Sequence, residues 1–197
     1  MVGNDIVDLS ISQVGDGTRK IRYLDKLFSD KELDIIHRLG DEDIWIWLLW
    51  SVKESVYKIV SRIENRIRYA PKTLRCISIT KKSEGKYETI VAYQGHKFVA
   101  NSELTDHYIH TVASNSMIEI NQLSSKVFTI FSNENESTSV DRNVIDYIKD
   151  KLGSRSTNIT LKRDENRVPH VFSGNQEVCQ LSISHHGGYG AFGLIYL

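Results

Sequence analysis

Residues 41–63 read DEDIWIWLLWSVKESVYKIVSRI and carry the strongest helix signal in the chain. Every side chain from Ile44 to Trp50 is apolar, so this part of the helix is apolar on nearly all sides. A helix of that kind is normally buried in the core of a protein. We therefore expect residues 41–63 to form a central helix, with the other elements packed around it.

Strands and further helices flank this central helix in the sequence. Before it, the spacing of apolar residues predicts a short strand over residues 2–9 and two helices between residues 19 and 39. Ser29 followed by Glu32 is typical of a capping box at the start of the second of these helices. After the central helix, strand patterns and turn signals predict four strands, over residues 74–80, 87–93, 96–100 and 108–113.

The remainder of the chain repeats this mixture in shorter form. The expected elements are a strand, a helix and three further strands, over residues 126–131, 140–152, 158–162, 178–184 and 189–196. Strands and helices mix without regular βαβ alternation, which indicates the α+β class. The sequence therefore predicts two similar α+β halves, residues 1–116 and residues 117–197.

The charge and the cysteine content argue against several classes of protein. Twenty-five basic and 25 acidic residues give a formal net charge of 0, which does not favour binding to nucleic acid. Cys76 and Cys179 form no C-x-x-C pair, and we expect both to be reduced thiols. Asp5 lies where a signal peptide would be apolar, and no apolar run approaches the ~20 residues of a membrane helix. We therefore expect a cytoplasmic protein without nucleic-acid or membrane partners.

Two short segments place acidic residues in apolar surroundings. Asp5 interrupts the first strand, and burying it is costly unless it is paired or binds a cation. A turn at the end of the strand would explain Asp5 equally well. Trp50, Glu54 and Lys58 follow one another at intervals of four residues and hence share one helical face. A surface salt bridge is the ordinary reading of Glu54 and Lys58, but their position at the end of a buried run favours a functional site.

A third segment, residues 181–192, reads LSISHHGGYGAF and predicts a strand that runs into a glycine turn. Serine hydroxyls, a histidine and glycine amides together could bind a phosphate group. A hairpin with two surface histidines is the alternative. His185 and His186 are adjacent and point to opposite faces of a strand, so we do not expect them to share a metal ion.

Together and in this order, these segments resemble the 4′-phosphopantetheinyl transferase superfamily. Residues 3–7 (GNDIV) are similar to its G-x-D-I-V opening, and residues 27–32 (LFSDKE) to its F-(S/T)-x-x-E segment. Residues 50–58 (WSVKESVYK) match the W-x-x-K-E-(A/S)-x-x-K signature, and residues 182–191 resemble the S-x-S-H stretch. The signature at residues 50–58 is highly specific and carries most of the weight.

The resemblance implies an enzyme that moves the phosphopantetheine arm of coenzyme A onto a serine of an acyl or peptidyl carrier protein. Adenosine 3′,5′-bisphosphate would be released. Asp5 and Glu54 would bind Mg²⁺, a cation that prefers carboxylate, water and phosphate oxygens. Glu54 would also take the proton of the carrier serine, and Lys58 would stabilise the charge that develops on the leaving phosphate.

The resemblance also implies a coenzyme A site in the second half of the chain. Ser184 and His185 would hold the ribose 3′-phosphate, and we place Arg167 and Lys53 among the residues that bind coenzyme A. Two departures from the family pattern stand out. Larger members carry a second acid where this chain has Val7, and residues 166–169 read NRVP in place of G-(K/R)-P. These departures keep open a catalytically silent homologue that binds coenzyme A or a carrier protein.

The order of the segments differs from that of the long family members. Residues 1–116 resemble the half that binds the metal, and residues from about 126 onward resemble the half that normally comes first and binds the 3′-phosphate. The chain therefore resembles a circular permutation of the long type, in which the two halves form a pseudo-dimer with the active site at their interface. Because both halves occur in one chain, we expect an active monomer.

A run of basic residues follows the signature segment. Only Glu64 supplies a negative charge among Lys58, Arg62, Arg66, Arg68, Lys72 and Arg75. Such a run is often simply a solvated face. Because carrier proteins of this system are typically acidic, the run is also a candidate docking surface for the carrier, with Arg62 and Arg66 as the residues to test.

Overall fold

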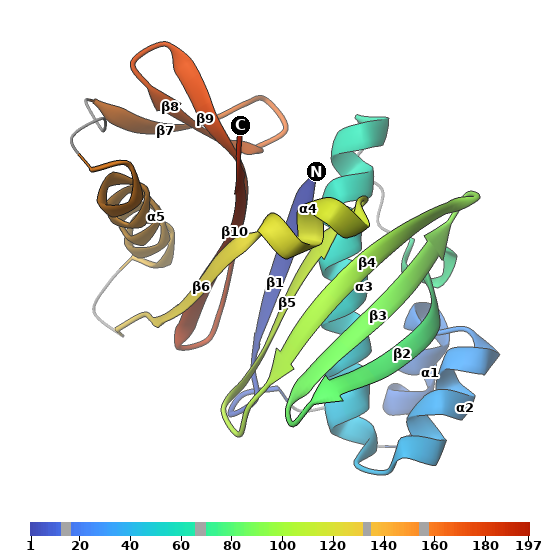
Figure 1. Cartoon of the computed structure of the whole chain (residues 1–197). Coiled ribbons are helices and arrows are strands. Elements are labelled where there is room, and N and C mark those ends of the chain that lie inside the picture. Colours follow the sequence, from blue (N-terminus) through green and yellow to red (C-terminus); the bar gives the residue numbers. More distant parts are fainter. Residues whose placement is uncertain (13–16, 66–69, 132–134, 154–157) are drawn as a thin grey trace.

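The computed structural model describes residues 1–12, 17–65, 70–131, 135–153 and 158–197 (Figure 1). The first antiparallel sheet has the strand order β1-β5-β4-β3-β2 and the second has the order β6-β10-β9-β8-β7. The first sheet comprises β1 (Val2–Asp8), β2 (Arg75–Ser83), β3 (Lys86–Tyr93), β4 (His96–Leu104) and β5 (Tyr108–Ser114). The second comprises β6 (Ser124–Thr129), β7 (Ile159–Arg163), β8 (Pro169–Ser173), β9 (Gln176–His186) and β10 (Tyr189–Tyr196).

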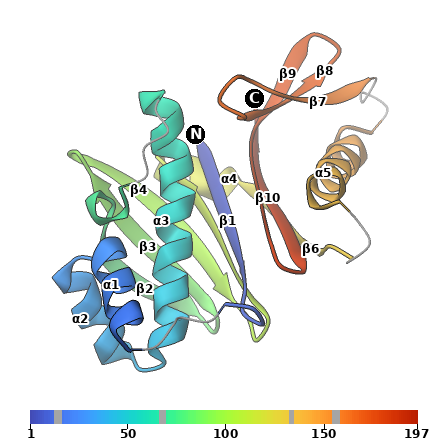
Figure 2. The same cartoon turned by 180° about the vertical axis from the view of Figure 1, so that it is seen from behind.

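The predicted central helix is confirmed as α3 (Glu42–Glu64), which packs on one face of the first sheet. Figure 2 shows α3 along this face, with α1 (Gly17–Leu27) and α2 (Asp30–Leu39) grouped at one end of it. The backbone of β1 approaches α3 so closely that a Cβ atom on Gly3 would overlap the carbonyl oxygen of Ser55. A glycine is therefore required at residue 3, and the residues that follow it on β1 are held against the helix.

The second sheet is covered by α5 (Glu136–Leu152), as Figure 1 shows. Val140, Val144 and Ile148 are buried against apolar residues of the sheet, including Leu181 and Phe192. Each sheet thus has its own apolar core with a helix on one face, and the α+β class is confirmed. Residues up to Ser114 build the first sheet and residues from Ser124 onward build the second, while Ile120, between them, packs against Val99 and Val112 of the first sheet.

The two sheets meet along β1. The N–H group of Asn4 donates to Ser182 Oγ at 3.0 Å, and the N–H group of Asp8 donates to His186 Nδ1 at 2.9 Å. In return, the N–H group of Gly188 donates to Asp8 Oδ2 at 2.9 Å. One strand of the first sheet is therefore joined at both ends to the strand and turn that the sequence singled out in the second half.

The short elements α4 (Met117–Gln122) and β8 were not predicted, and the helix α5 begins earlier than expected. The helix α4 is too short to show a helical period, and the side chain of Ser116 caps it. The strand β8 begins at Pro169, and proline suppresses a strand prediction although it is tolerated at the first position of a strand. The helix α5 begins at Glu136 instead of residue 140, because Asn135 accepts a hydrogen bond from the Thr138 N–H group and caps it.

Two structural findings concern the cysteines and the length of the apolar helices. Cys76 and Cys179 are buried and unpaired. Among the described residues, no helix combines the length and the apolar character needed to cross a membrane.

Candidate active site

Asp5 lies on β1 opposite Thr111 of β5, with its side chain only 15% exposed. Its Oδ1 atom is 3.8 Å from Lys58 Nζ, whereas its Oδ2 atom is buried and has no hydrogen-bond partner among the described residues. Burial raises the pKa of Asp5, whereas the nearby charge of Lys58 and hydrogen bonding to Ser51 and to the backbone of Ile6 oppose this effect. A buried carboxylate oxygen without a donor is costly, and a bound cation would remove that cost.

Lys58 reaches from α3 across β1 to the second sheet. Its Nζ atom donates to the carbonyl oxygen of Asn4 at 2.6 Å and to that of Ile183 at 3.4 Å. Burial lowers the pKa of Lys58, while the charges of Asp5 and Glu54 raise it. The ammonium group is therefore fixed at the point where β1 and β9 come together.

Glu54 lies one helical turn before Lys58 and is partly buried. Tyr23 and Tyr57 both have raised pKa values, caused first by burial and second by the negative charge of Glu54. Trp50 packs against Tyr23, with ring centroids 6.2 Å apart. Glu54 thus lies among aromatic side chains on the face of α3 that also carries Lys58.

A cavity of about 330 Å³ opens beside Asp5 and Lys58 and is also lined by residues of the second half of the chain. These further residues are Ser137, Val140, Arg163, Arg167, Ile183, Ser184 and His185. Five predicted site residues therefore line this cavity: Asp5, Lys58, Arg167, Ser184 and His185. Glu54 is not among the residues that line the cavity.

The second half contributes polar and basic groups whose positions are fixed by neighbours. Ser184 Oγ accepts a hydrogen bond from Asn4 Nδ2 at 2.8 Å. His185 Nδ1 is 2.8 Å from Glu136 Oε2 at the start of α5. Arg167 lies in the turn between β7 and β8 with a left-handed φ of 62°. Basic side chains fixed in this way suit a ligand with several negative charges.

Sequence reasoning missed Arg163 and Ser137. The guanidinium group of Arg163 makes two hydrogen bonds with the carboxylate of Asp141, at 2.9 and 2.6 Å, and these bonds raise its pKa. Arg163 is the last residue of β7 and lies four residues before Arg167. Two arginines so close together at the end of a strand could have indicated a site for a negatively charged ligand. Ser137 lies in a polar serine-rich segment and carries no sequence signal of its own.

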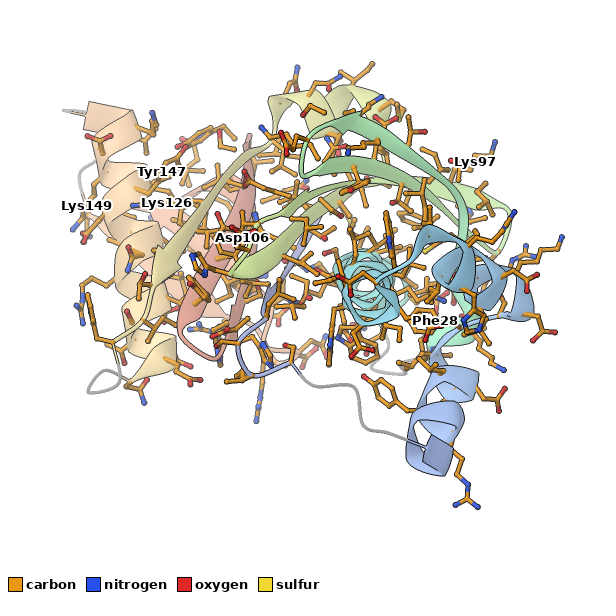
Figure 3. All side chains as sticks on the ribbon, turned by 90° about the horizontal axis from the view of Figure 1, so that it is seen from below. Phe28, Lys97, Asp106, Lys126, Tyr147 and Lys149 are labelled. Carbon is orange, nitrogen blue, oxygen red and sulfur yellow. The ribbon has the colours of Figure 1, made fainter. Side chains whose placement is uncertain are left out.

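The structure places Lys53 away from this cavity, which corrects its assignment to coenzyme A binding. Lys53 is 0% exposed, and its Nζ atom donates to Leu27 O at 2.9 Å, Glu32 Oε2 at 2.9 Å and Pro71 O at 3.0 Å. It also lies 5.1 Å from the ring of Phe28, which Figure 3 labels beside α3. All three donors of the ammonium group are therefore used to join α3 to α1, α2 and the segment before β2.

Glu32, the partner of Lys53, belongs to the segment at residues 27–32 that resembles the family pattern. The carboxylate of Glu32 accepts hydrogen bonds from the N–H group and the hydroxyl of Ser29, and from the N–H group of Cys76. Glu32 thus links the start of α2 to β2 while it neutralises the buried Lys53. Both residues stabilise the fold around the site.

Several residues of the predicted basic docking surface have partners within the fold. Arg62 donates to the carbonyl oxygens of Val2 at 3.2 Å and Leu181 at 2.9 Å, so it joins the two sheets. Lys72 is paired with Asp25 at 2.8 Å, and Lys58 lines the cavity. Arg66 and Arg68 lie outside the described residues. Arg62, Lys72 and Lys58 therefore have contacts within the fold, and docking of a carrier on this run stays a prediction.

Fold and cavity together define an α+β protein with one acidic and several basic groups around a common site, as expected for binding a phosphorylated ligand. A family model described as the 4′-phosphopantetheinyl transferase superfamily matches residues 1–113. This range exceeds half of the 197 residues, and the chain belongs to this superfamily. A search of curated proteins found no match. The matched range contains Asp5, Glu54 and Lys58, whereas Ser184 and His185 lie beyond it.

Proposed function

We propose that this protein transfers the 4′-phosphopantetheine group of coenzyme A to a serine of an acyl or peptidyl carrier protein and releases adenosine 3′,5′-bisphosphate. The observation that carries this proposal is the composition of the 330 Å³ cavity. Asp5 and Lys58, from the part of the chain matched by the family, meet basic and hydroxyl groups from outside the matched range. Coenzyme A carries a pyrophosphate and a separate 3′-phosphate, and a site of this composition offers groups for both.

The basic residues of the second half would bind the phosphates. Arginine binds phosphate through paired N–H donors, and Arg163 and Arg167 both line the cavity. Ser184 and His185 would hold the 3′-phosphate. The carboxylates of Asp141 and Glu136, which contact Arg163 and His185, would orient these two side chains before the ligand arrives.

Asp5 and Glu54 would hold Mg²⁺, which when bound would neutralise negative charge on the pyrophosphate. The buried Oδ2 atom of Asp5, which lacks a partner among the described residues, fits this role. Among the residues that the structure describes, no three His, Cys, Asp or Glu side chains lie close enough together to hold a metal ion on their own. Val7 offers no oxygen, so the remaining ligands would be water and phosphate oxygens, as is usual for this cation.

Glu54 would accept the proton of the carrier serine, whose oxygen forms a new bond to the phosphorus next to the pantetheine arm. The P–O bond to adenosine 3′,5′-bisphosphate breaks in the same exchange. Lys58 is fixed by two backbone carbonyl groups close to Asp5 and would stabilise the charge on the leaving phosphate.

Mass spectrometry of candidate carrier proteins tests this proposal. Each carrier is incubated with coenzyme A, Mg²⁺ and the protein, and one carrier should gain a single phosphopantetheine group on its serine. Glu54→Ala should abolish the gain, because the proton acceptor and one carboxylate are lost together. Binding of coenzyme A without modification of any carrier would instead support the catalytically silent homologue, and full activity of Glu54→Ala would contradict the assigned roles.

A further inference from the structure

Asn4 is a buried polar residue next to Asp5 on β1. Successive side chains of a strand point to opposite faces. Asp5 therefore points towards α3 and Lys58, whereas Asn4 points towards the second sheet, where it contacts Ser182 and Ser184. Asn4 is 0% exposed, so its contacts are shielded from water.

Three groups of Asn4 contact three different partners. Its backbone N–H group donates to Ser182 Oγ at 3.0 Å, and its carbonyl oxygen accepts a hydrogen bond from Lys58 Nζ at 2.6 Å. Its side-chain Nδ2 atom donates to Ser184 Oγ at 2.8 Å, whereas its Oδ1 atom is buried and has no hydrogen-bond partner among the described residues. Only the contact with Ser184 depends on the Asn4 side chain, so a substitution at residue 4 can remove it and leave the two backbone contacts in place.

The contact with Asn4 constrains the hydroxyl group of Ser184. A serine hydroxyl has one O–H donor and two acceptor lone pairs. Because Asn4 Nδ2 donates to Ser184 Oγ, the hydroxyl hydrogen must point elsewhere. Ser184 lines the cavity, and its hydrogen can therefore donate to a ligand there. A phosphate oxygen accepts such a bond, whereas it would be repelled by a serine lone pair.

We infer that Asn4 is a positioning residue that sets the Ser184 hydroxyl as a hydrogen-bond donor to the 3′-phosphate of coenzyme A. This inference rests on the proposed function. It also couples two parts of the site, because the same residue of β1 contacts Lys58 through its backbone and Ser184 through its side chain.

Asn4→Asp provides the sharpest test, because aspartate has the shape of asparagine but cannot donate a hydrogen bond when ionised. Ser184 would then donate to residue 4 and no longer to the ligand. Asn4→Ala removes the contact without adding a charge. The matched control is Asp8→Ala, which removes the hydrogen bond from the Gly188 N–H group and so weakens the same junction between β1 and the second sheet at its other end.

The measurement is the affinity for adenosine 3′,5′-bisphosphate relative to adenosine 5′-monophosphate, by titration calorimetry of each variant. This ratio isolates the 3′-phosphate. Ser184→Ala and Asn4→Asp should each lower the ratio at least about tenfold, as expected for one hydrogen bond to a charged group. Asn4→Ala should lower it by less, because the Ser184 hydroxyl is no longer oriented but can still donate. Asn4→Ala combined with Ser184→Ala should lower it no further than Ser184→Ala alone. Asp8→Ala should lower stability and leave the ratio unchanged.

An unchanged ratio in Asn4→Asp, or an equal loss in Asp8→Ala, would overturn the positioning role in favour of a purely structural one. A wild type that binds both nucleotides equally would also overturn it. The proposed function is judged separately by modification of the carrier, so the two can fail independently. If Asn4→Ala does not fold, Asn4→Leu, which fills nearly the same space without a hydrogen-bond donor or a charge, decides the question.

Discussion

At the scale of single residues, the buried carboxylate of Asp5 destabilises the fold, and a role in metal binding would explain why it is present. Burial raises the pKa of Asp5 above that of the unfolded chain, so the folded state binds its proton more tightly. By linkage, ionised Asp5 destabilises the fold at neutral pH, and this destabilisation is relieved as the pH falls through the raised pKa. The unpartnered Oδ2 atom is consistent with this cost.

Asp5→Asn should therefore separate stability from activity. We expect the free energy of unfolding at pH 7 to stay equal or rise, because the buried charge is removed while the shape is kept. Transfer should fall at least about 100-fold, because one ligand of Mg²⁺ is lost. Urea unfolding and carrier modification measure the two effects. EDTA should stop the wild type, and added Mg²⁺ should restore it. A variant that loses stability and keeps its activity would contradict both assignments.

The sequence predicted the positions of residues best where these depend only on the helix or strand that carries them. The four-residue spacing of Glu54 and Lys58 correctly placed both on one face of α3. Lys53 was misassigned because its neighbour Glu54 lies about 100° away around the helix, and the sequence does not say which side meets Glu32. Arg163 was missed because its role depends on Asp141, a residue of another element.

At the scale of elements, β5 carries a buried histidine with a clear consequence for stability. His110 is 5% exposed, and burial, followed by the charge of Lys58, lowers its pKa from 6.5 to about 4. Between these two values the unfolded chain binds more protons than the folded protein. Stability should therefore fall as the pH falls from about 6.5 to about 4.

For His110 alone, this effect predicts a loss of about 3 kcal/mol in the free energy of unfolding over that pH range, and the relief of the buried Asp5 charge acts against it. Urea titrations at several pH values would measure it, and His110→Gln should show a clearly weaker dependence on pH. The matched control is His107→Gln, a substitution in the exposed turn before β5 that leaves His110 in place. Equal pH dependence in wild type and His110→Gln would show that His110 is not the group responsible.

The elements themselves were predictable where their patterns are long. The 23 residues of α3 and the strand β10 were predicted almost to their ends, because each has a sustained apolar pattern. The short helix α4 and the proline-started strand β8 were not, because packing and capping decide them more than periodicity does. The hydrogen bonds that join β1 to β9 could not be predicted from the sequence either, because they connect residues 178 positions apart.

At the scale of the whole molecule, Arg62 joins the two sheets through the carbonyl oxygens of Val2 and Leu181. Arg62→Ala should lower the free energy of unfolding by about 1–3 kcal/mol, because two partly buried carbonyl groups lose a charged donor. The KM for the carrier and the KM for coenzyme A should change together, because the cavity between the sheets is loosened. Urea unfolding and steady-state kinetics test this. An increase confined to the KM for the carrier would instead support a role of Arg62 in docking the carrier protein.

The arrangement of the site also predicts its behaviour in mixtures of variants. Asp5 lies in the first sheet and His185 in the second, and both line the same cavity of one chain. We therefore expect an active monomer, which light scattering at assay concentration would measure. Mixing Asp5→Ala with His185→Ala should restore no activity, because every chain still lacks one side of its own cavity. A mixture of Asp5→Ala with wild type, as the control, should keep the activity of the wild-type share. If activity returned in the mixture of variants, the site would be shared between chains, and two chains would be needed to bind one coenzyme A.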